Sequence, residues 1–388
     1  MNTIEKDKTY LANTYARFPL EIVSGKGSLA FGADGKSYID MGAGIAVNTF
    51  GYCDEVFNAA VKKQLDTVQH LSNLYYSAPA ASLAEALVKK SGLKKAFFCN
   101  SGAEANECAI KTARKWGAEH KGAGAYKIVT LTGSFHGRTV TTLSATGQEV
   151  FHKYFDPFTE GFVYAPINDG KALSSLIDDK TCAVMVEFVQ GEGGVNPLDP
   201  AFVQTIFDLK KKWNYLVIAD EVQTGNGRTG KYFAYQQYGV LPDIVTTAKG
   251  LGGGLPIGAC LFGEQTAEVL GAGDHGSTFG GNPVAAAGAL SVVDRVDDAL
   301  LREVAAKGEY IKQKLEGQAG VLSVEGMGLM LGVTLSCDAK AVVGKCLEKG
   351  VLFLTAKKKV RMLPALNIPY PLLDKAIEVL LEAVKEEL

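Results

Sequence analysis

The 388-residue sequence has almost no excess of charge of either sign. It contains 40 lysine and arginine residues against 42 aspartate and glutamate residues, for a formal net charge of -2. Proteins that bind nucleic acid through its phosphates carry an excess of positive charge, so nucleic-acid binding is disfavoured as the main activity. Internal repeats and low-complexity segments are also absent, which disfavours fibrous and disordered classes.

Long hydrophobic runs are lacking as well. The longest weakly polar run covers residues 283–293 and is far too short to span a bilayer. The first ten residues lack the apolar segment of a signal peptide. We therefore expect a soluble, unexported, cytoplasmic protein with no membrane partner.

Cysteine is scarce and scattered. The seven cysteines include no C-x-x-C pair. An odd number of cysteines at wide spacing is typical of reduced thiols rather than of disulfides or a zinc site. The sequence therefore predicts a reducing compartment, and it implies no metal.

What the sequence does contain is a regular alternation of strand-like and helix-like segments. Short β-branched apolar runs recur at residues 127–132, 182–188, 215–220 and 243–249, and longer helix-compatible segments separate them. Such alternation predicts an α/β fold with a parallel sheet. Residues 97–117 precede these runs and are typical of a strand, a turn and a helix.

The chain is longer than a usual single domain, so we expect two domains. The α/β pattern predicts a large domain over residues 51–295. Amphipathic helices and glycine-broken strands follow, which predicts a smaller α+β domain over residues 296–388. Residues 1–50, which contain a hairpin with a tight turn at Asp34 and Gly35, are expected to contribute to the small domain.

Polar residues follow the apolar runs at the points where the strands are expected to end. Asp220 closes one run, Lys249 closes another, and Glu187 lies near the end of a third. In open α/β sheets, ligands bind at the carboxyl ends of the strands. The site is therefore expected at this edge of the sheet.

Asp220 and Lys249 are the most suggestive of these strand-end residues. A carboxylate that follows five largely apolar residues has little solvent to stabilise its charge, so Asp220 needs a cationic partner. That partner is either a protonated pyridine nitrogen or the cation of a structural ion pair. Desolvation lowers the pKa of a lysine, so Lys249 could condense with an aldehyde, although most lysines are solvated surface groups.

Two segments offer donors for an anion. The turn before the expected helix leaves the amides of Gly102 and Ala103 unpaired and ready for a phosphate, although a plain serine N-cap is the commoner explanation. Ser277 and Thr278 add hydroxyl groups in a glycine-rich loop. Neither segment is specific on its own.

The segment GSFHGR follows the first apolar run. Phe135 offers an aromatic face for a flat ring, and Arg138 offers a guanidinium for a carboxylate. His136 lies between them and is more often a packed or hydrogen-bonded imidazole than a base.

A nucleotide triphosphatase is a rival because two segments nearly match the P-loop pattern G-x-x-x-x-G-K-[ST]. Residues 225–232 read GNGRTGKY, but Tyr232 stands where a magnesium-binding hydroxyl is needed, and the segment follows Asp220 too closely. Residues 30–37 read AFGADGKS, lack the first glycine and lie in the expected hairpin. Both departures disfavour this class.

Six segments taken together resemble the class III aminotransferases, the ornithine-type branch of the pyridoxal-phosphate enzymes. They are, in the order and spacing of that family, NSGAEANE, GSFHGRT, VEFVQGEGG, IADEVQTGNGRTG, TTAKGLGGGLPIG and HGSTFGGNP. The resemblance runs from YARFPL to RMLPALN and covers nearly the whole chain. It implies the PLP-dependent transferase fold of the aspartate aminotransferase type (fold type I), an α/β fold with a mainly parallel seven-stranded sheet in the large domain.

The resemblance implies a pyridoxal 5'-phosphate cofactor, held by Lys249 as a Schiff base and paired with Asp220 through its pyridine nitrogen. The other cofactor contacts that it implies are Gly102 and Ala103 at the phosphate, Phe135 and Val222 on the two ring faces, Gln223 at the ring hydroxyl, and Thr278 at the phosphate. In this family the last of these reaches across from the partner subunit. A homodimer with active sites at the interface is therefore implied.

For substrates, the resemblance implies that Arg138 and Ser277 bind N-acetylornithine. Arg361 would bind the α-carboxylate of glutamate or 2-oxoglutarate. When a terminal amine enters instead, Glu187 would pair with Arg361. The segments YARFPLEIVSGKGS and GIAVNTFGY favour the branch of the family that uses N-acetylornithine as amine donor.

Two departures from the family pattern bear on specificity. The usual G-H-x-H-P is here GYCDE at residues 51–55, and Met362 stands where an aromatic residue is common. Aminotransferases for ornithine, succinylornithine or 4-aminobutyrate and a glutamate-semialdehyde aminomutase share the cofactor residues and remain alternatives. A catalytically silent binding protein of the same fold is a further alternative, but it would be free to lose Lys249 or Asp220.

Overall fold

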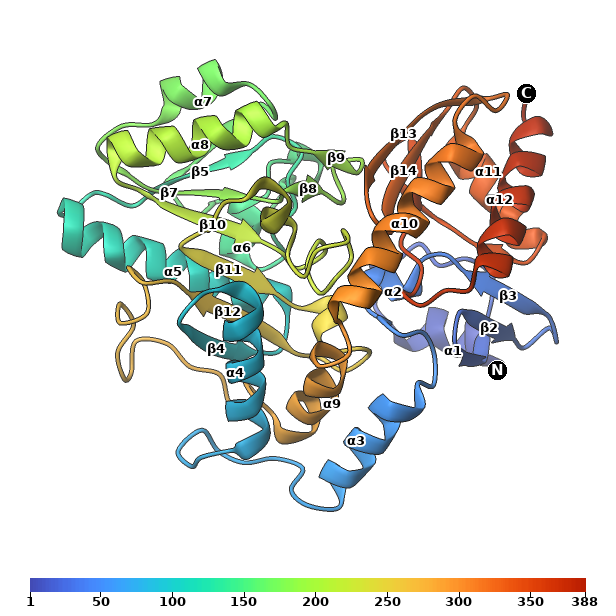
Figure 1. Ribbon diagram of the computed structural model, residues 1–388, viewed down its shortest axis with the longest axis horizontal. Helices are drawn as coiled ribbons and strands as arrows, with labels where there is room; N and C mark the ends of the chain where they lie inside the picture. The colour runs from blue at the N-terminus through green and yellow to red at the C-terminus, as the bar shows by residue number, and fades with distance from the viewer.

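The computed structural model describes residues 1–388, and its largest element is a seven-stranded sheet (Figure 1). The strand order is β4-β12-β11-β10-β7-β5-β6. Only β12 runs against its neighbours β11 and β4, so the sheet is mainly parallel, as the resemblance implied. The strands are β4 (Lys95–Cys99), β5 (Lys127–Leu131), β6 (Phe162–Ala165), β7 (Thr181–Val186), β10 (Leu216–Asp220), β11 (Ile244–Thr247) and β12 (Gly258–Phe262).

Helices cover both faces of this sheet, which explains why its central strands are apolar along their whole length. Every residue of β7, β10, β11 and β12 is buried. On one face, side chains of α5 pack on alternate residues such as Met185 and Ile218, and the residues between them face the core under α4 and α8. The helices of this part are α3 (Glu55–Leu65), α4 (Ala78–Ser91), α5 (Gly102–Lys121), α6 (Val140–Ala145), α7 (Gly170–Leu176), α8 (Pro200–Trp213) and α9 (Pro283–Val293), with short 3-10 turns η1 (Glu149–Phe151), η2 (Ala234–Tyr238) and η3 (Lys249–Leu251).

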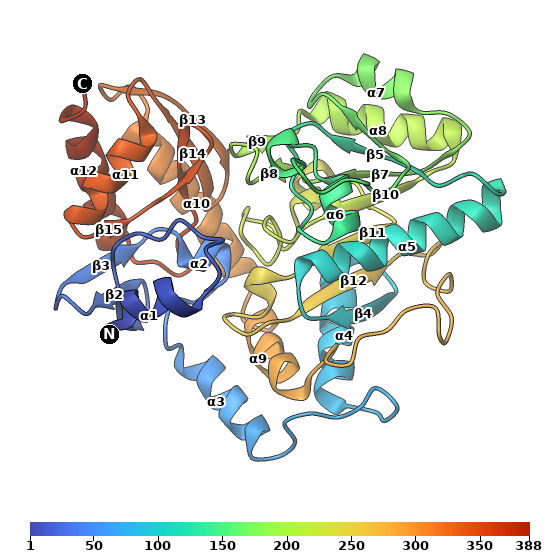
Figure 2. The same cartoon turned by 180° about the vertical axis from the view of Figure 1, so that it is seen from behind.

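The C-terminal part of the chain forms a separate antiparallel sheet of four strands with its own apolar core. Its strands are β13 (Val321–Met327), β14 (Met330–Leu335), β17 (Lys359–Met362) and β16 (Leu354–Ala356), and its helices are α10 (Asp298–Leu315), α11 (Ala339–Glu348) and α12 (Tyr370–Lys385). A short hairpin of β8 (Val189–Gln190) and β9 (Asn196–Pro197) lies between the two sheets (Figure 2).

The N-terminal strands lie beside this C-terminal part (Figure 2). They form a meander whose last strand, β3, pairs in parallel with β15 (Val351–Leu352). The remaining N-terminal elements are α1 (Thr3–Tyr10), β1 (Ile22–Lys26), β2 (Leu29–Gly32), β3 (Ser37–Asp40) and the short turn α2 (Ala43–Ala46). The predicted hairpin is confirmed, and Gly35 takes a φ of 79° in its turn, a conformation that favours glycine.

The two departures from the family pattern have structural partners. Asp54 caps α3 by accepting a hydrogen bond from the Phe57 N–H (2.8 Å), and it also accepts one from Arg295 Nη1 (3.0 Å). Met362 is fully buried in the C-terminal core. None of the helices combines the length and apolarity needed to cross a bilayer.

Candidate active site

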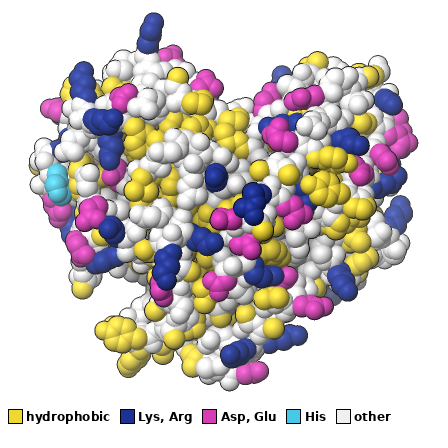
Figure 3. Space-filling view, viewed as in Figure 1, with side chains coloured by type: hydrophobic (Ala, Val, Ile, Leu, Met, Phe, Trp, Pro, Cys, Tyr) yellow, Lys and Arg dark blue, Asp and Glu magenta, His cyan; other side chains and the backbone are white.

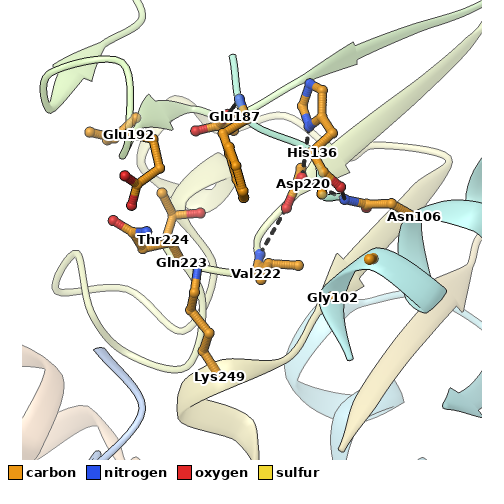
Figure 4. Close-up of a pocket in the computed structure, with 14 residues that line it drawn as sticks. Gly102, Asn106, His136, Glu187, Glu192, Asp220, Val222, Gln223, Thr224 and Lys249 are labelled. Carbon is orange, nitrogen blue, oxygen red and sulfur yellow. Dashed lines mark hydrogen bonds and ion pairs between the residues drawn. The ribbon is translucent and has the colours of Figure 1, made fainter. Parts of the chain in front are cut away.

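The carboxyl ends of the parallel strands meet at one cavity (Figure 4). Asp220 ends β10, Lys249 follows β11, Glu187 follows β7, and His136 lies in the loop after β5. The N-terminus of α5 closes the remaining side. The lining residues are Gly102, Ala103, Asn106, Phe135, His136, Gly137, Glu187, Val189, Glu192, Asp220, Val222, Gln223, Thr224 and Lys249.

Asp220 is buried in the wall of this cavity and held from three directions (Figure 4). Its Oδ2 atom accepts a hydrogen bond from Asn106 Nδ2 (2.8 Å) and lies 2.7 Å from His136 Nδ1. Its Oδ1 atom accepts one from the Val222 N–H (3.1 Å). The carboxylate is thus fixed in orientation and faces a cavity in which it has no lysine or arginine partner.

His136 behaves as a hydrogen-bonded imidazole, as the sequence favoured. Burial works against its protonation, but the hydrogen bond to Asp220 and the charge of that carboxylate outweigh burial and raise the pKa of His136. Its other ring nitrogen, Nε2, is buried without a partner. Through Nδ1 the ring therefore supports Asp220.

Lys249 extends into the cavity from the segment after β11 (Figure 4). Burial lowers the pKa of its amine, against the opposing charges of Asp220, Glu192 and Glu187. Its backbone takes a φ of 44°, a left-handed conformation that costs a non-glycine residue on the order of 1 kcal/mol. The residue is therefore both strained and desolvated, which is typical of a functional lysine.

The start of α5 offers free amides to the cavity. Ser101 caps the helix by accepting a hydrogen bond from the Glu104 N–H (3.2 Å), while the N–H groups of Gly102 and Ala103 have no acceptor in the protein. A Cβ atom on Gly102 would lie 2.6 Å from Val222 Cγ1, so only glycine lets the helix start come this close to Val222. The arrangement suits an anion at the end of the cavity.

The pairing of Arg361 is the point at which the structure corrects the sequence reasoning. Arg361 Nη1 donates to Glu192 Oε1 (2.5 Å) and, at 3.4 Å, to Gln223 Oε1. Glu187, the expected partner, instead accepts hydrogen bonds from the N–H groups of Phe135 (2.6 Å) and Gly191 (2.9 Å).

The physical reason is the turn that follows Glu187. The Glu187 carboxylate is buried, and backbone N–H groups donate to both of its oxygens. Burial raises the pKa of Glu187 to about 7. Glu192 lies in the following turn, is partly exposed, and faces the buried guanidinium of Arg361. The carboxylate available to Arg361 is therefore Glu192.

The remaining predicted residues are not brought to this cavity within one chain. Arg138 is exposed, and its guanidinium lies 4.0 Å from the ring centre of Phe151. Ser277 and Thr278 line a different hollow, where Ser277 Oγ accepts a hydrogen bond from Asn100 Nδ2 (3.1 Å). The role of Thr278 across a subunit interface stays a prediction, as do the roles of Arg138 and Ser277 in binding N-acetylornithine.

Sequence reasoning missed Asn106, which holds the centre of the site together. Asn106 Nδ2 donates to Asp220 and to the His136 carbonyl (2.7 Å), and its Oδ1 accepts from Thr246 Oγ1 (2.7 Å). The available signal was an amide next to the apolar stripe of α5, which consists of Ala105, Ala109, Ala113 and Trp116, all of them buried. A buried amide on such a helix needs partners of its own.

The P-loop alternative has no support in the structure. The segment 225–232 forms a buried loop that runs into the 3-10 turn η2, and its Tyr232 is buried in the core. The segment 30–37 forms the hairpin of β2 and β3. Neither segment links a strand to the start of a helix, as a P-loop requires.

Glu221, next to Asp220, is fully buried without a cationic partner. Its carboxylate accepts hydrogen bonds from Thr224 Oγ1 (2.5 Å) and from the N–H groups of Ala234 and Tyr235 (3.0 Å each). Burial raises the pKa of Glu221 to about 7 from its ordinary value of 4.5. Glu221 thus fixes the loop behind the site, and it links stability to pH.

We expect Glu221→Gln to flatten the pH dependence of stability. The folded state holds the Glu221 proton more tightly than the unfolded state, so its contribution is full below the unfolded pKa and is lost as the pH rises through about 7. Between about pH 5 and pH 8 the wild type should lose up to about 3 kcal/mol more unfolding free energy than the variant, whose amide does not titrate. Urea unfolding across that range measures how the unfolding free energy of each protein changes with pH. Equal changes in the wild type and the variant would contradict the expectation.

Comparison with known proteins gives consistent results. The family model described as "Aminotransferase class-III" matches residues 10–384. A protein of Haemophilus ducreyi named acetylornithine aminotransferase is 48% identical over 98% of each chain, and one of Methanocaldococcus jannaschii with the same name is 45% identical over 99% of this chain and 98% of its own.

Two solved structures are also similar over nearly the whole fold. The ornithine aminotransferase of Toxoplasma gondii has a TM-score of 0.94 at 30% identity and covers 99% of this chain and 94% of its own. The N-acetylornithine aminotransferase of Stenotrophomonas maltophilia has a TM-score of 0.85 at 35% identity, with coverages of 99% and 98%.

Proposed function

The chain belongs to the class III aminotransferases, and from that premise we propose that it moves the terminal amino group of N2-acetyl-L-ornithine to 2-oxoglutarate. The products would be N-acetyl-L-glutamate 5-semialdehyde and L-glutamate, a step of arginine biosynthesis. The names of the similar proteins support this amine donor. The observation that carries the proposal is the meeting of Lys249, Asp220 and Glu192, the ion-pair partner of Arg361, at one cavity.

The residues of the cavity fit pyridoxal 5'-phosphate, the cofactor of this family. The free amides of Gly102 and Ala103 suit its phosphate. The buried carboxylate of Asp220 suits a protonated pyridine nitrogen, and the amine of Lys249 suits the aldehyde. Phe135, Val222 and Gln223 line the space between these groups and would contact the ring.

When bound, the cofactor supplies an aldehyde and an electron-withdrawing ring that accepts the electrons left when the substrate carbon loses its proton. Lys249 would carry that proton, because the lowered pKa of its amine makes the neutral, proton-accepting form accessible. Asp220 would keep the ring nitrogen protonated. Asn106 and His136 would hold Asp220 in the orientation that this task requires.

The Arg361–Glu192 pair would let one cavity accept two substrates of different charge. When glutamate or 2-oxoglutarate binds, Arg361 would release Glu192 and bind the α-carboxylate. When a terminal amine binds, the pair would close and leave no free positive charge to repel the amine. The Nε atom of Arg361, buried without a partner, supports a role in binding an anion.

We expect Arg361→Met and Glu192→Gln to impair different half-reactions. Loss of the guanidinium should weaken use of glutamate by about 10- to 100-fold, because a hydrogen bond to a charged group contributes about 1.5–3 kcal/mol. Loss of the carboxylate should leave an unpaired guanidinium and lower the rate with N-acetylornithine by about 10-fold. Single-turnover rates with each substrate alone measure both effects, and identical profiles for the two variants would contradict the switch.

Arg138 and Ser277 are proposed to bind the end of N-acetylornithine that lies away from the reacting amine. These contacts would make the enzyme prefer N-acetylornithine over other amine donors. Initial rates with 2-oxoglutarate as acceptor should be highest with N-acetylornithine, compared with N-succinylornithine, ornithine and 4-aminobutyrate. A preference for ornithine or 4-aminobutyrate would contradict the proposed donor while leaving the cofactor residues intact.

A homodimer is proposed because the implied site draws Thr278 from a second chain. Exposed apolar side chains gather on the loop between α3 and α4 at the lower edge of Figure 3, where Leu74, Tyr75 and Tyr76 are 88%, 68% and 106% exposed. Such a cluster is typical of an interaction surface. Light scattering should give twice the 41.2 kDa of one chain, and a monomer with full activity would exclude the shared site.

The domain limits and the compartment also remain proposals. The parallel pairing of β3 with β15 supports the assignment of residues 1–50 to the small domain, with residues 51–295 and 296–388 as the large and small domains. All seven cysteines are free thiols, which supports a reducing compartment such as the cytoplasm.

A further inference from the structure

The loop of residues 224–230 overlaps the segment that nearly matched the P-loop pattern. It contacts both the segment that carries Lys249 and the segment that carries Arg361. It starts directly after Gln223, which lines the cavity, and most of it is buried. Asn226, Arg228 and Thr229 are each at most 3% exposed. A polar loop this deeply buried requires a partner for each of its charged groups.

One end of the loop is tied to the segment that carries Lys249. Asn226 Nδ2 donates to Thr247 Oγ1 (2.9 Å) and to the Ala248 carbonyl (3.2 Å), the residue before Lys249. The backbone of Asn226 takes a φ of 58°, a left-handed conformation that asparagine tolerates better than most residues. The loop is thereby fixed relative to the amine.

The other end is tied to the segment that carries Arg361. Arg228 Nη1 donates to the carbonyls of Leu329 (3.2 Å) and Pro364, and the Arg228 carbonyl accepts a hydrogen bond from the Leu329 N–H (3.0 Å). Pro364 lies three residues after Arg361. Leu329 is the last residue of the turn before β14, the strand that pairs with β17 around Arg361.

Burying the guanidinium of Arg228 at this position costs free energy of desolvation. Its guanidinium is buried without a carboxylate, and burial lowers the pKa of Arg228 to about 9. An apolar side chain would fill the same space without the cost of desolvating a charge. An apolar side chain has no donor, whereas the Nη1 group of Arg228 donates to two carbonyl groups at once.

We propose that Arg228 is a positioning residue that sets the place of Arg361 relative to Lys249. It acts through the carbonyls of Leu329 and Pro364, on either side of the strand pair that carries Arg361. This role rests on the proposed binding of the substrate α-carboxylate by Arg361. It predicts selectivity: the half-reaction with glutamate depends on Arg228, whereas the half-reaction with N-acetylornithine, in which Arg361 is held by Glu192, depends on it much less.

The test uses Arg228→Met and Arg228→Lys in the cofactor-loaded enzyme. Arg228→Met should lower kcat/KM for glutamate by roughly 10- to 100-fold, because a displacement of about 1 Å has an effect of that size. The rate with N-acetylornithine should change by less than about 3-fold. Arg228→Lys should recover part of the loss, because its ammonium group can still donate to the carbonyls, although from a different position. A calorimetric titration with glutarate should show the same weakening of the dissociation constant, without any reaction.

The control is Arg295→Met, which removes an arginine that is partly buried. Arg295 donates to Asp54 and lies 3.9 Å over the ring of Phe50, far along the chain from the Arg361 segment. Any general loss of stability should affect both half-reactions alike in this variant. If Arg228→Met, or Arg228→Lys should the methionine variant not fold, lowers both half-reactions equally or leaves glutarate binding unchanged, the inference is overturned.

Arg361→Met, measured in parallel, separates this inference from the proposed function. If Arg361→Met loses glutamate selectively and the Arg228 variants do not, only the positioning role fails. If Arg361→Met itself shows no selectivity, the proposed role of Arg361 fails, and the positioning role fails with it.

Discussion

Replacing Lys249 by alanine is expected to lower the rate of transamination by about 100- to 10,000-fold, the range that a positioned acid–base group contributes. The variant loses both the amine that suits the cofactor aldehyde and the group that carries the substrate proton. The fold should persist, because alanine removes a buried amine that makes no hydrogen bond to a carboxylate. Steady-state rates with N-acetylornithine and 2-oxoglutarate measure the loss.

The control for this variant is Lys349→Ala, which removes a lysine on the surface of the C-terminal part. Lys349 pairs with Glu382 and Glu386, both exposed, and neither pairing involves a residue of the cavity. Its activity should match the wild type. A Lys249→Ala enzyme that turned over within about threefold of the wild type would mean that the proton is carried elsewhere.

The second large effect is expected for Asp220→Asn, which should lower kcat by about 100- to 1,000-fold, the loss typical when one fixed electrostatic group is removed. An amide keeps the shape of Asp220 but supplies no negative charge to a protonated ring nitrogen. His136 would also lose the charge that raises its pKa. Cofactor affinity, measured by equilibrium dialysis, should fall together with kcat.

Asp243→Asn is the matched control, because it also removes a buried carboxylate beside the same sheet. Asp243 accepts hydrogen bonds from Lys210 Nζ (2.9 Å) and from the Val217 N–H (2.8 Å), at the opposite end of β10 from Asp220. It should lower stability and leave kcat nearly unchanged. Equal loss of kcat in the two variants would show that Asp220 matters only for the fold.

The strands and the residues at their ends could be predicted from the sequence. The strands of a parallel sheet are buried on both faces, so each appears as a continuous apolar run. Asp220 and Lys249 were found in this way, and the structure brings both to one cavity. The start of α5 at Gly102 was found from its capping serine. Local patterns were sufficient for these features.

The missed features depend on contacts between distant segments. Glu187 and Glu192 are both carboxylates after the same strand. Only the folded chain shows that the N–H groups of Phe135 and Gly191 occupy Glu187, so that Glu192 meets Arg361. The role of Arg228 depends on carbonyl groups more than a hundred residues later. Thr278 is a different case, because its expected partner lies in another chain.

The most direct test of the account is to treat the cofactor-loaded enzyme with borohydride, which reduces a carbon–nitrogen double bond between cofactor and lysine, and then to map the peptides by mass. The account predicts the cofactor mass on Lys249 alone, with visible absorbance lost in step. A cofactor mass on any other lysine, or none after complete loss of absorbance, would contradict it.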